Sequence, residues 1–407
     1  MAFDPSSPSR ARSRAKPTKS SPAAWPMVQT VAPPKDQDGD PELRRVLVLQ
    51  GGGALGAYQA GVFDALNGAG VEPDWVAGIS IGAINAAIIA GNAPENRVAR
   101  LKEFWRQATS GPQVAPPVLL PGGQDWVARL NAANALIYGA PGFFSPRMVP
   151  PPFAAPSAPD ALSFYDSRPL KQTLERLVDF DRINSGVTRL SVGAVNIETG
   201  NFTYFENVHG RRIGPEHIMA SGALPPGLPP IQIDGAWYWD GGLVSNTPLD
   251  WVLQAETGAP MAIFQVDLFP ARGALPRTMA EVADREMDIR FSSRTRLNTD
   301  QSLQLRRLKR LARDLLADLP PDLRDNPHAR RLADAACENA VNIVHLIYRG
   351  KPHENGHRDY EFSRATMIQH WASGMRAARQ AMTRGADILN PVGADVTHTF
   401  DGSEETQ

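Results

Sequence analysis

Short apolar runs alternate with helical patterns in the first quarter of the chain. Residues 46–49 form a continuous apolar run, which is typical of a strand buried on both faces. A glycine-rich turn follows, and apolar residues then recur at helical spacing over residues 58–66. The same order returns with a strand-like run at residues 75–77 and a small, apolar helix at residues 83–90. Strand, helix, strand and helix in succession predict a parallel sheet with helices on both faces, which is a three-layer α/β/α domain.

Further strand signals extend this domain. The Asp-Gly pair at residues 234–235 lies between two strand-like runs and predicts a hairpin with a two-residue turn. Residues 190–197 and 201–205 form a second hairpin-like pair, and residues 261–268 predict another core strand. We therefore expect one folded domain over residues 44–275.

The remaining segments differ from this domain in composition. Residues 1–43 are basic and rich in Pro and Ser, which predicts a disordered tail. Residues 110–165 carry many prolines and apolar side chains, which fits a lid insertion as well as an ordinary packed excursion. Residues 280–390 predict a helical, arginine-rich C-terminal region, and residues 391–407 a flexible acidic tail.

Composition narrows the classes of partner and compartment. The formal net charge of −1 over 407 residues gives no field that would favour nucleic acid. The single cysteine, Cys337, excludes an internal disulfide. Because neither a signal peptide nor an apolar run of about 18 residues occurs, we expect a cytoplasmic protein that touches membranes only peripherally. His353 and His357 have metal-pair spacing, but Pro352 and Gly356 argue against the helix it needs, so no metal is expected.

A turn around one serine carries the first chemical signal. Gly78-Ile79-Ser80-Ile81-Gly82 follows the second predicted strand and precedes a helix. In a nucleophile elbow, such small flanking residues allow a sharp turn that exposes the serine hydroxyl. The pattern alone is weak and also fits a plain turn, but the strand before it and the helix after it favour Ser80 as a nucleophile.

A second glycine-rich turn lies between the first predicted strand and helix, at residues 51–56. Backbone N–H groups in such a loop are unpaired and can converge on an oxyanion. The spacing of Gly51, Gly53 and Gly56 also fits a dinucleotide fingerprint, which requires an acidic residue at the end of the second strand. That strand ends in residues 77–80 without one. An oxidoreductase with a nucleotide cofactor on this loop, and a purely structural turn, remain as alternatives.

A carboxylate far downstream could activate the serine. Asp240-Gly241-Gly242 closes the predicted hairpin that contains residues 234–235. Aspartate at a strand end is usually a turn former. Within hydrogen-bond reach of a serine, however, a carboxylate can accept the hydroxyl proton directly, without a histidine.

These three segments together resemble the patatin-like phospholipases, in which a glycine-rich loop, Gly-x-Ser-x-Gly and Asp-Gly-Gly or Asp-Gly-Ala occur in this order. The resemblance covers about residues 45–275, and residues 285–390 resemble a helical extension of unknown function on some bacterial members. It implies a patatin-like α/β/α sheet with a helical C-terminal extension. It also implies a lipid acyl hydrolase without a cofactor, acting through an acyl-serine intermediate with Ser80 as nucleophile and Asp240 as base. The implied oxyanion donors are the backbone amides of Gly51, Gly52, Gly53 and Ala54; Gly56, Gly78, Gly82, Gly241 and Gly242 support the motifs.

One position departs from the family pattern. Many relatives carry Arg or Lys where this chain has Leu55, so the loop lacks a side-chain cation. The backbone oxyanion hole is unaffected, but a neutral lipid or a plain carboxylic ester becomes a candidate substrate beside phospholipids. A non-catalytic lipid-binding protein on the same fold is another alternative. Late histidines such as His345 and His370 would give the Ser–Asp–His order of α/β-hydrolases, but that fold places its elbow after several strands. The oligomeric state is not predicted.

Overall fold

The computed structural model describes residues 42–114, 123–155, 159–254, 259–336, 340–350, 357–384 and 399–401. The basic tail (except its last two positions), most of the acidic tail, Cys337 and His353 lie outside the described residues, as do positions 115–122 and 156–158 of the 110–165 segment.

A mixed sheet forms the centre of the described chain. Eight of its nine strands follow the order β11, β10, β9, β1, β2, β5, β8 and β7. The ninth strand, β6, pairs with β5 outside this order. Neighbouring strands from β11 to β5 are parallel, whereas β6, β7 and β8 pair antiparallel. The strands are β1 (Arg44–Leu49), β2 (Trp75–Gly78), β5 (Arg189–Asn196), β6 (Phe202–Glu206), β7 (Ile231–Ile233), β8 (Ala236–Asp240), β9 (Met261–Asp267), β10 (Val341–Ile347) and β11 (Thr399–Asp401).

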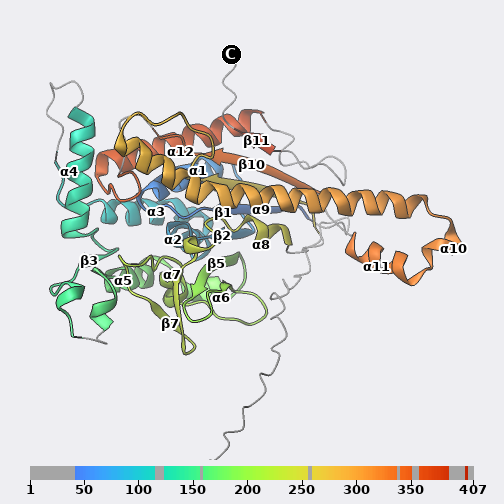
Figure 1. The fold of residues 1–407 in the computed structure, drawn as a ribbon, viewed down its shortest axis with the longest axis horizontal. Coiled ribbons are helices and arrows are strands. Elements are labelled where there is room, and N and C mark those ends of the chain that lie inside the picture. Colours follow the sequence, from blue (N-terminus) through green and yellow to red (C-terminus); the bar gives the residue numbers. More distant parts are fainter. Residues whose placement is uncertain are drawn as a thin grey trace, which may run out of the picture.

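Helices cover both faces of this sheet (Figure 1). Leu47 and Leu49 of β1 pack in a large core with α1, α2, α3 and α12, whereas Val46 and Val48 pack in a smaller core with α8. Both faces of β1 are therefore buried, and the predicted three-layer α/β/α arrangement is confirmed. The main helices are α1 (Gly56–Gly68), α2 (Ile81–Ala90), α3 (Pro94–Ala108), α5 (Arg168–Leu177), α6 (Phe180–Asn184), α7 (Pro215–Ser221), α8 (Leu249–Gln254), α9 (Met279–Asp318) and α12 (Arg364–Arg384).

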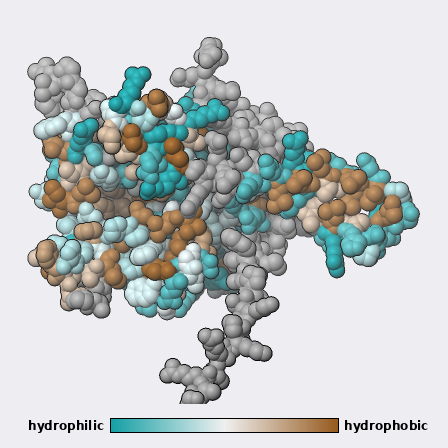
Figure 2. Space-filling view, in the orientation of Figure 1, coloured by the Kyte–Doolittle hydropathy of each residue, from teal (hydrophilic) through white to brown (hydrophobic). Residues whose placement is uncertain are grey.

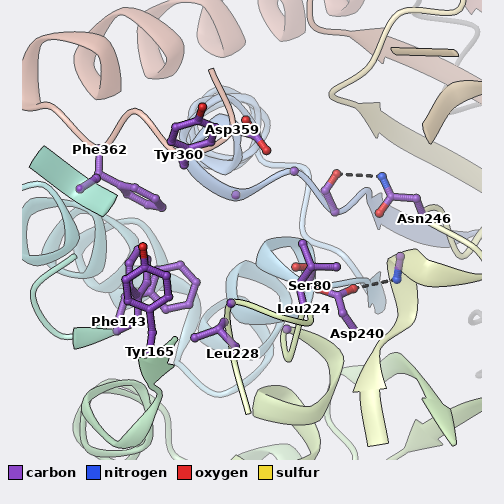
Figure 3. A pocket seen from close by; sticks show the side chains of 18 of the residues that line it. Ser80, Phe143, Tyr165, Leu224, Leu228, Asp240, Asn246, Asp359, Tyr360 and Phe362 are labelled. Atoms are coloured by element: carbon purple, nitrogen blue, oxygen red, sulfur yellow. Dashed lines mark hydrogen bonds between the residues drawn. The ribbon is translucent and has the colours of Figure 1, made fainter. Parts of the chain in front are cut away.

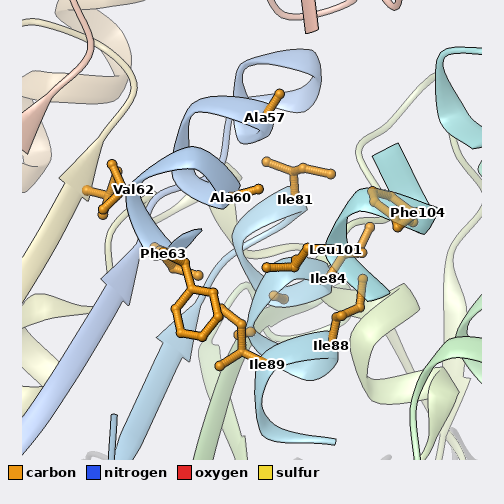
Figure 4. Packing of buried hydrophobic residues seen from close by; sticks show 14 of the residues in the cluster. Ala57, Ala60, Val62, Phe63, Ile81, Ile84, Ile88, Ile89, Leu101 and Phe104 are labelled. Atoms are coloured by element: carbon orange, nitrogen blue, oxygen red, sulfur yellow. The ribbon is translucent and has the colours of Figure 1, made fainter. Parts of the chain in front are cut away.

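The helix that follows Ser80 lies at the middle of the larger core. All ten residues of α2 are buried, in agreement with its small and apolar sequence. Figure 4 shows Ile81, Ile84 and Ile88 of α2 packed beside residues of α1 and α3. Since a fully buried isoleucine contributes about 1.5–3 kcal/mol, this packing fixes the N-terminus of α2 firmly against the sheet.

Strands β7 and β8 form the predicted hairpin with a two-residue turn. Asp234 and Gly235 both have positive φ, at 49° and 84°, as a type I′ turn requires. The pairing of Ile233 with Ala236 closes this turn. The hairpin between β5 and β6 also occurs as predicted.

The C-terminal region contains helices, as expected, and also a strand that the sequence analysis missed. β10 pairs in parallel with β9 over seven residues and so extends the central sheet. Helix α12 packs against α1 in backbone contact, because a Cβ atom on Gly61 would lie 2.0 Å from the carbonyl oxygen of Trp371. The predicted helical C-terminal region therefore also contributes a strand to the central sheet. The short apolar run Val341–Ile347 was not recognised as a strand, because the sequence on both sides of it has a helical composition.

Two segments project from this body. Within residues 110–165 lie α4 (Gly123–Tyr138), the short strand β3 (Ser145–Pro146) and the 3-10 helices η2 (Pro151–Phe153) and η3 (Pro159–Leu162), and β4 (Tyr165–Asp166) follows at the end. The far half of α9 forms an arm with α10 (Pro321–Arg324) and α11 (Pro327–Ala335), and Figure 2 shows apolar residues along it. Among the described residues, no helix is both long and apolar enough to span a bilayer.

Candidate active site

Ser80 lies at the turn between β2 and α2, as its motif predicts. Its backbone is in the left-handed half of conformational space, with φ of 55° and ψ of −122°. Such strain costs of order 1–3 kcal/mol and is often found at functional sites. A Cβ atom on Gly78 would lie 2.3 Å from the carbonyl oxygen of Gly82, and one on Gly82 would lie 2.3 Å from that of Leu49. The two flanking glycines are therefore sterically required by the turn.

The structure brings Asp240 next to Ser80. Asp240 ends β8 and is only 2% exposed. Its Oδ1 accepts a hydrogen bond of 2.7 Å from the backbone N–H of Gly242. Burial raises the pKa of Asp240 from 3.8 to about 7, and its hydrogen bonds with the Ser80 side chain and the Gly242 N–H limit the rise. Figure 3 shows the two side chains together at one end of a cavity.

The glycine-rich loop borders this cavity through Gly51, Gly52 and Gly53. The N–H of Gly51 donates to the carbonyl oxygen of Asn246 at 3.1 Å, and the N–H of Ala54 donates to that of Asp359 at 2.7 Å. Gly51 and Ala54 are thus corrected as oxyanion donors, because their N–H groups are already used. The amides of Gly52 and Gly53 have no acceptor among the described residues, and they precede the N-terminus of α1, where negative charge is favoured.

Asn246 is a site residue that the motif search missed. Its Nδ2 donates to the carbonyl oxygen of Gly51 at 3.0 Å, so side chain and backbone of Asn246 hold both polar groups of that glycine. A Cβ atom on Gly51 would lie 2.4 Å from Asn246 Oδ1, so only glycine fits this clamp. The only sequence signal was its place six residues after Asp240, in the turn before α8.

An apolar cavity of about 280 Å³ extends from Ser80. Its walls come from segments far apart in the chain, and Phe143, Phe144 and Phe362 meet edge to face. The described residues that line it include two carboxyl groups, of Asp240 and Asp359, and no lysine, arginine or histidine. The apolar lining consists chiefly of Leu136, Phe143, Phe144, Tyr165, Leu224, Leu228, Phe269, Phe291, Tyr360 and Phe362.

The three late histidines that the structure describes do not complete a Ser–Asp–His triad. His370 is buried on α12 against the ring of Tyr348, and His345 lies on β10. His357 contacts the Tyr360 hydroxyl. None of these three lines the cavity. Among the described residues, no group of three or more acidic, histidine or cysteine side chains could hold a metal ion.

Two family models match this chain. The family model for patatin-like phospholipases matches residues 47–253, and a second model, described as patatin phospholipase, matches residues 289–391. No curated protein matches. Two solved structures are similar at TM-scores too low to bear on function. VipD from Legionella pneumophila has a TM-score of 0.37 and 13% identity, and the match covers 90% of this chain and 72% of that one. The ExoU–SpcU complex from the type III secretion system of Pseudomonas aeruginosa has a TM-score of 0.24 and 14% identity, and the match covers 86% of this chain and 71% of that one.

Proposed function

Because the chain belongs to the patatin-like phospholipase family, we propose that it hydrolyses carboxylic esters of lipids, with Ser80 as nucleophile and Asp240 as general base. The observation that supports this proposal is the contact of the buried Asp240 carboxyl with the Ser80 side chain, beside the amides of Gly52 and Gly53, which have no acceptor among the described residues. A carboxylate in direct contact can accept the proton of a serine hydroxyl.

The reaction proceeds in two halves. In the first, Ser80 Oγ attacks the ester carbonyl while its proton passes to the Asp240 carboxylate, and the oxyanion accepts hydrogen bonds from the N–H groups of Gly52 and Gly53. The tetrahedral intermediate then collapses, Asp240 returns the proton to the leaving alcohol, and an acyl-serine remains. In the second half, Asp240 takes a proton from water, and the resulting hydroxide attacks the acyl-serine. Collapse releases the fatty acid, and Asp240 returns the proton to Ser80 Oγ, which restores the hydroxyl and the carboxylate.

The environment of Asp240 suits both of its roles. A general base works best when its pKa lies near the working pH, because it must accept and release the same proton in each half-reaction. Burial raises the pKa of Asp240 to about 7. An exposed aspartate, with a pKa near 3.8, would be a much weaker base toward a serine hydroxyl.

The cavity supports a lipid as the acyl donor. Aromatic and leucine side chains form its walls, which fits an acyl chain bound beside Ser80 (Figure 3). Exposed apolar side chains of Leu136, Ile137 and Tyr138 on α4, together with Leu224, lie at or near this cavity. Such a patch is costly in water and is typical of an interaction surface. We propose that this patch makes a peripheral contact with the membrane.

The test compares the wild-type chain with Ser80→Ala and Asp240→Asn on phospholipids, neutral glycerides and p-nitrophenyl esters. Both substitutions should lower kcat/KM by at least about a thousandfold. A fluorophosphonate probe should label the wild-type chain and the control Ser110→Ala, which removes an exposed serine after α3, but not Ser80→Ala. Equal hydrolysis by all the variants would overturn the mechanism. Lipid binding without labelling or hydrolysis would instead favour a non-catalytic binding protein.

A further inference from the structure

A second carboxyl group lines the cavity, and the proposed reaction does not use it. Asp359 belongs to the C-terminal part of the chain, between β10 and α12, yet its carbonyl oxygen accepts the N–H of Ala54 at 2.7 Å. A Cβ atom on Gly53 would lie 2.0 Å from that same oxygen, and Gly53 has φ of +56°. Asp359 is therefore locked against the loop that carries the two free amides.

The Asp359 side chain has no partner on another described residue. Its Oδ1 is shielded from solvent and accepts no hydrogen bond, and the only hydrogen bond to the carboxyl comes from its own backbone. The neighbouring cation, Arg358, forms an ion pair with Asp288 on α9. Burial raises the pKa of Asp359, while the Arg358 charge opposes the rise and the Asp284 charge adds to it. Asp359 nonetheless lines the cavity, so a ligand at this wall could supply the hydrogen bond that its carboxyl does not receive from another described residue.

The chemistry around Asp359 restricts that ligand. A phosphate in the cavity would meet two carboxyl groups and, among the described lining residues, no side-chain cation, so only the loop amides would compensate its desolvation. A hydroxyl group can accept a hydrogen bond from a protonated carboxyl or donate one to an ionised carboxyl. It therefore fits Asp359 in either state without adding charge.

We propose that Asp359 binds a free hydroxyl group of the substrate near the scissile ester, so that the cavity selects uncharged, hydroxylated lipid esters over phosphate-bearing ones. This inference rests on the proposed hydrolase function. The hydroxyl has two chemical sources. It belongs either to the alcohol, as in a partial glyceride, or to the acyl chain, as in a 3-hydroxyacyl ester.

The experiment uses the full chain and pairs of decanoate esters that differ in one group, all in the same detergent micelles. Monodecanoylglycerol is compared with propyl decanoate for the alcohol side, and ethyl 3-hydroxydecanoate with ethyl decanoate for the acyl side. Decanoyl lysophosphatidic acid tests the phosphate. For the wild type we expect kcat/KM for one hydroxylated ester to be about tenfold higher than for the plain ester of the same pair. A ratio of this size corresponds to one hydrogen bond in a site shielded from water. We also expect lysophosphatidic acid to be the poorest substrate.

Three substitutions test whether Asp359 causes the preference for the hydroxylated ester. Asp359→Leu should erase the ratio between hydroxylated and plain ester, whereas the isosteric Asp359→Asn should keep most of it. Tyr360→Phe removes the neighbouring hydroxyl of the cavity wall and should leave the ratio unchanged. A purely structural role for Asp359 would lower both rates together and leave their ratio intact. Labelling of Ser80 by a fluorophosphonate shows whether each variant keeps an assembled site.

The outcomes separate this inference from the proposed function. A wild type that hydrolyses both members of each pair equally, or an Asp359→Leu variant that labels normally and keeps the preference, overturns the role of Asp359 and leaves the hydrolase intact. Loss of the preference in Tyr360→Phe alone assigns hydroxyl binding to Tyr360 and also overturns it. Hydrolysis that survives in Ser80→Ala defeats the proposed function itself.

Discussion

The buried carboxyl of Asp240 should make the folded chain less stable as the pH rises. Its pKa is about 7 in the folded chain against an ordinary value of 3.8, and one pKa unit corresponds to about 1.4 kcal/mol. Ionisation of this group should therefore lower the free energy of unfolding by about 4 kcal/mol. Below pH 3.8 the carboxyl is neutral in both states and the loss is absent. The loss grows between pH 3.8 and 7 and is complete above pH 7.

Asp240→Asn isolates this contribution, because asparagine keeps the shape and can still accept the Gly242 N–H. Urea unfolding of both proteins at pH 4 and pH 8 gives the two differences. We expect similar stability at pH 4 and a variant more stable by about 4 kcal/mol at pH 8. A difference under about 1 kcal/mol at pH 8, or a gain of equal size at both pH values, would refute a costly buried charge.

The same ionisation should govern the rate. If Asp240 must be ionised to accept the Ser80 proton, log kcat/KM should rise with slope one up to about pH 7 and then level off. A hydrolysis rate that is flat from pH 5 to pH 8 would show that the base is another group, or that its pKa is not raised.

Three further predictions concern the contacts that hold the glycine-rich loop and helix α12 in place. Gly53→Ala should lower kcat/KM at least tenfold, because the added methyl meets the Asp359 carbonyl oxygen; steady-state kinetics that match the wild type would contradict this. Asn246→Ala frees the Gly51 carbonyl and should lower kcat about tenfold with little change in KM, whereas a change in KM alone would indicate a binding role. Gly61→Val should cost about 3 kcal/mol in urea unfolding, because the side chain would enter the backbone of α12; unchanged stability would show that α1 and α12 do not touch so closely.

Local patterns predicted the parts of the fold that depend on neighbours in sequence. The continuous run at residues 46–49 indicated a strand buried on both faces, and the Asp-Gly pair at residues 234–235 indicated a two-residue turn; both occur. Gly78 likewise reports a steric limit set within a few residues, because a Cβ atom there would meet the carbonyl oxygen of Gly82. These features follow from backbone geometry, which a short stretch of sequence specifies.

The features that the sequence did not predict depend on contacts between segments that are far apart in the chain. Which amides of the loop stay free depends on Asn246, 195 positions after Gly51, and on the carbonyl oxygen of Asp359. Neither residue lies in a periodic pattern or a recognisable motif. The strand β10 was missed for a related reason, since its place is fixed by pairing with β9 rather than by its own flanks.

Contacts from the C-terminal part of the described chain therefore hold the glycine-rich loop in place. Residues 51–56 form the loop, but Asp359 takes up the Ala54 amide and presses against Gly53, and α12 holds α1 directly behind. The loop thus depends on contacts from the region matched by the second family model, residues 289–391. Since an oxyanion site works only when its donors are held in place beforehand, a chain in which residues 357–363 have not docked would keep Ser80 and Asp240 but lack a fixed pair of amides. The C-terminal region is on this argument a part of the site rather than an appendage to it.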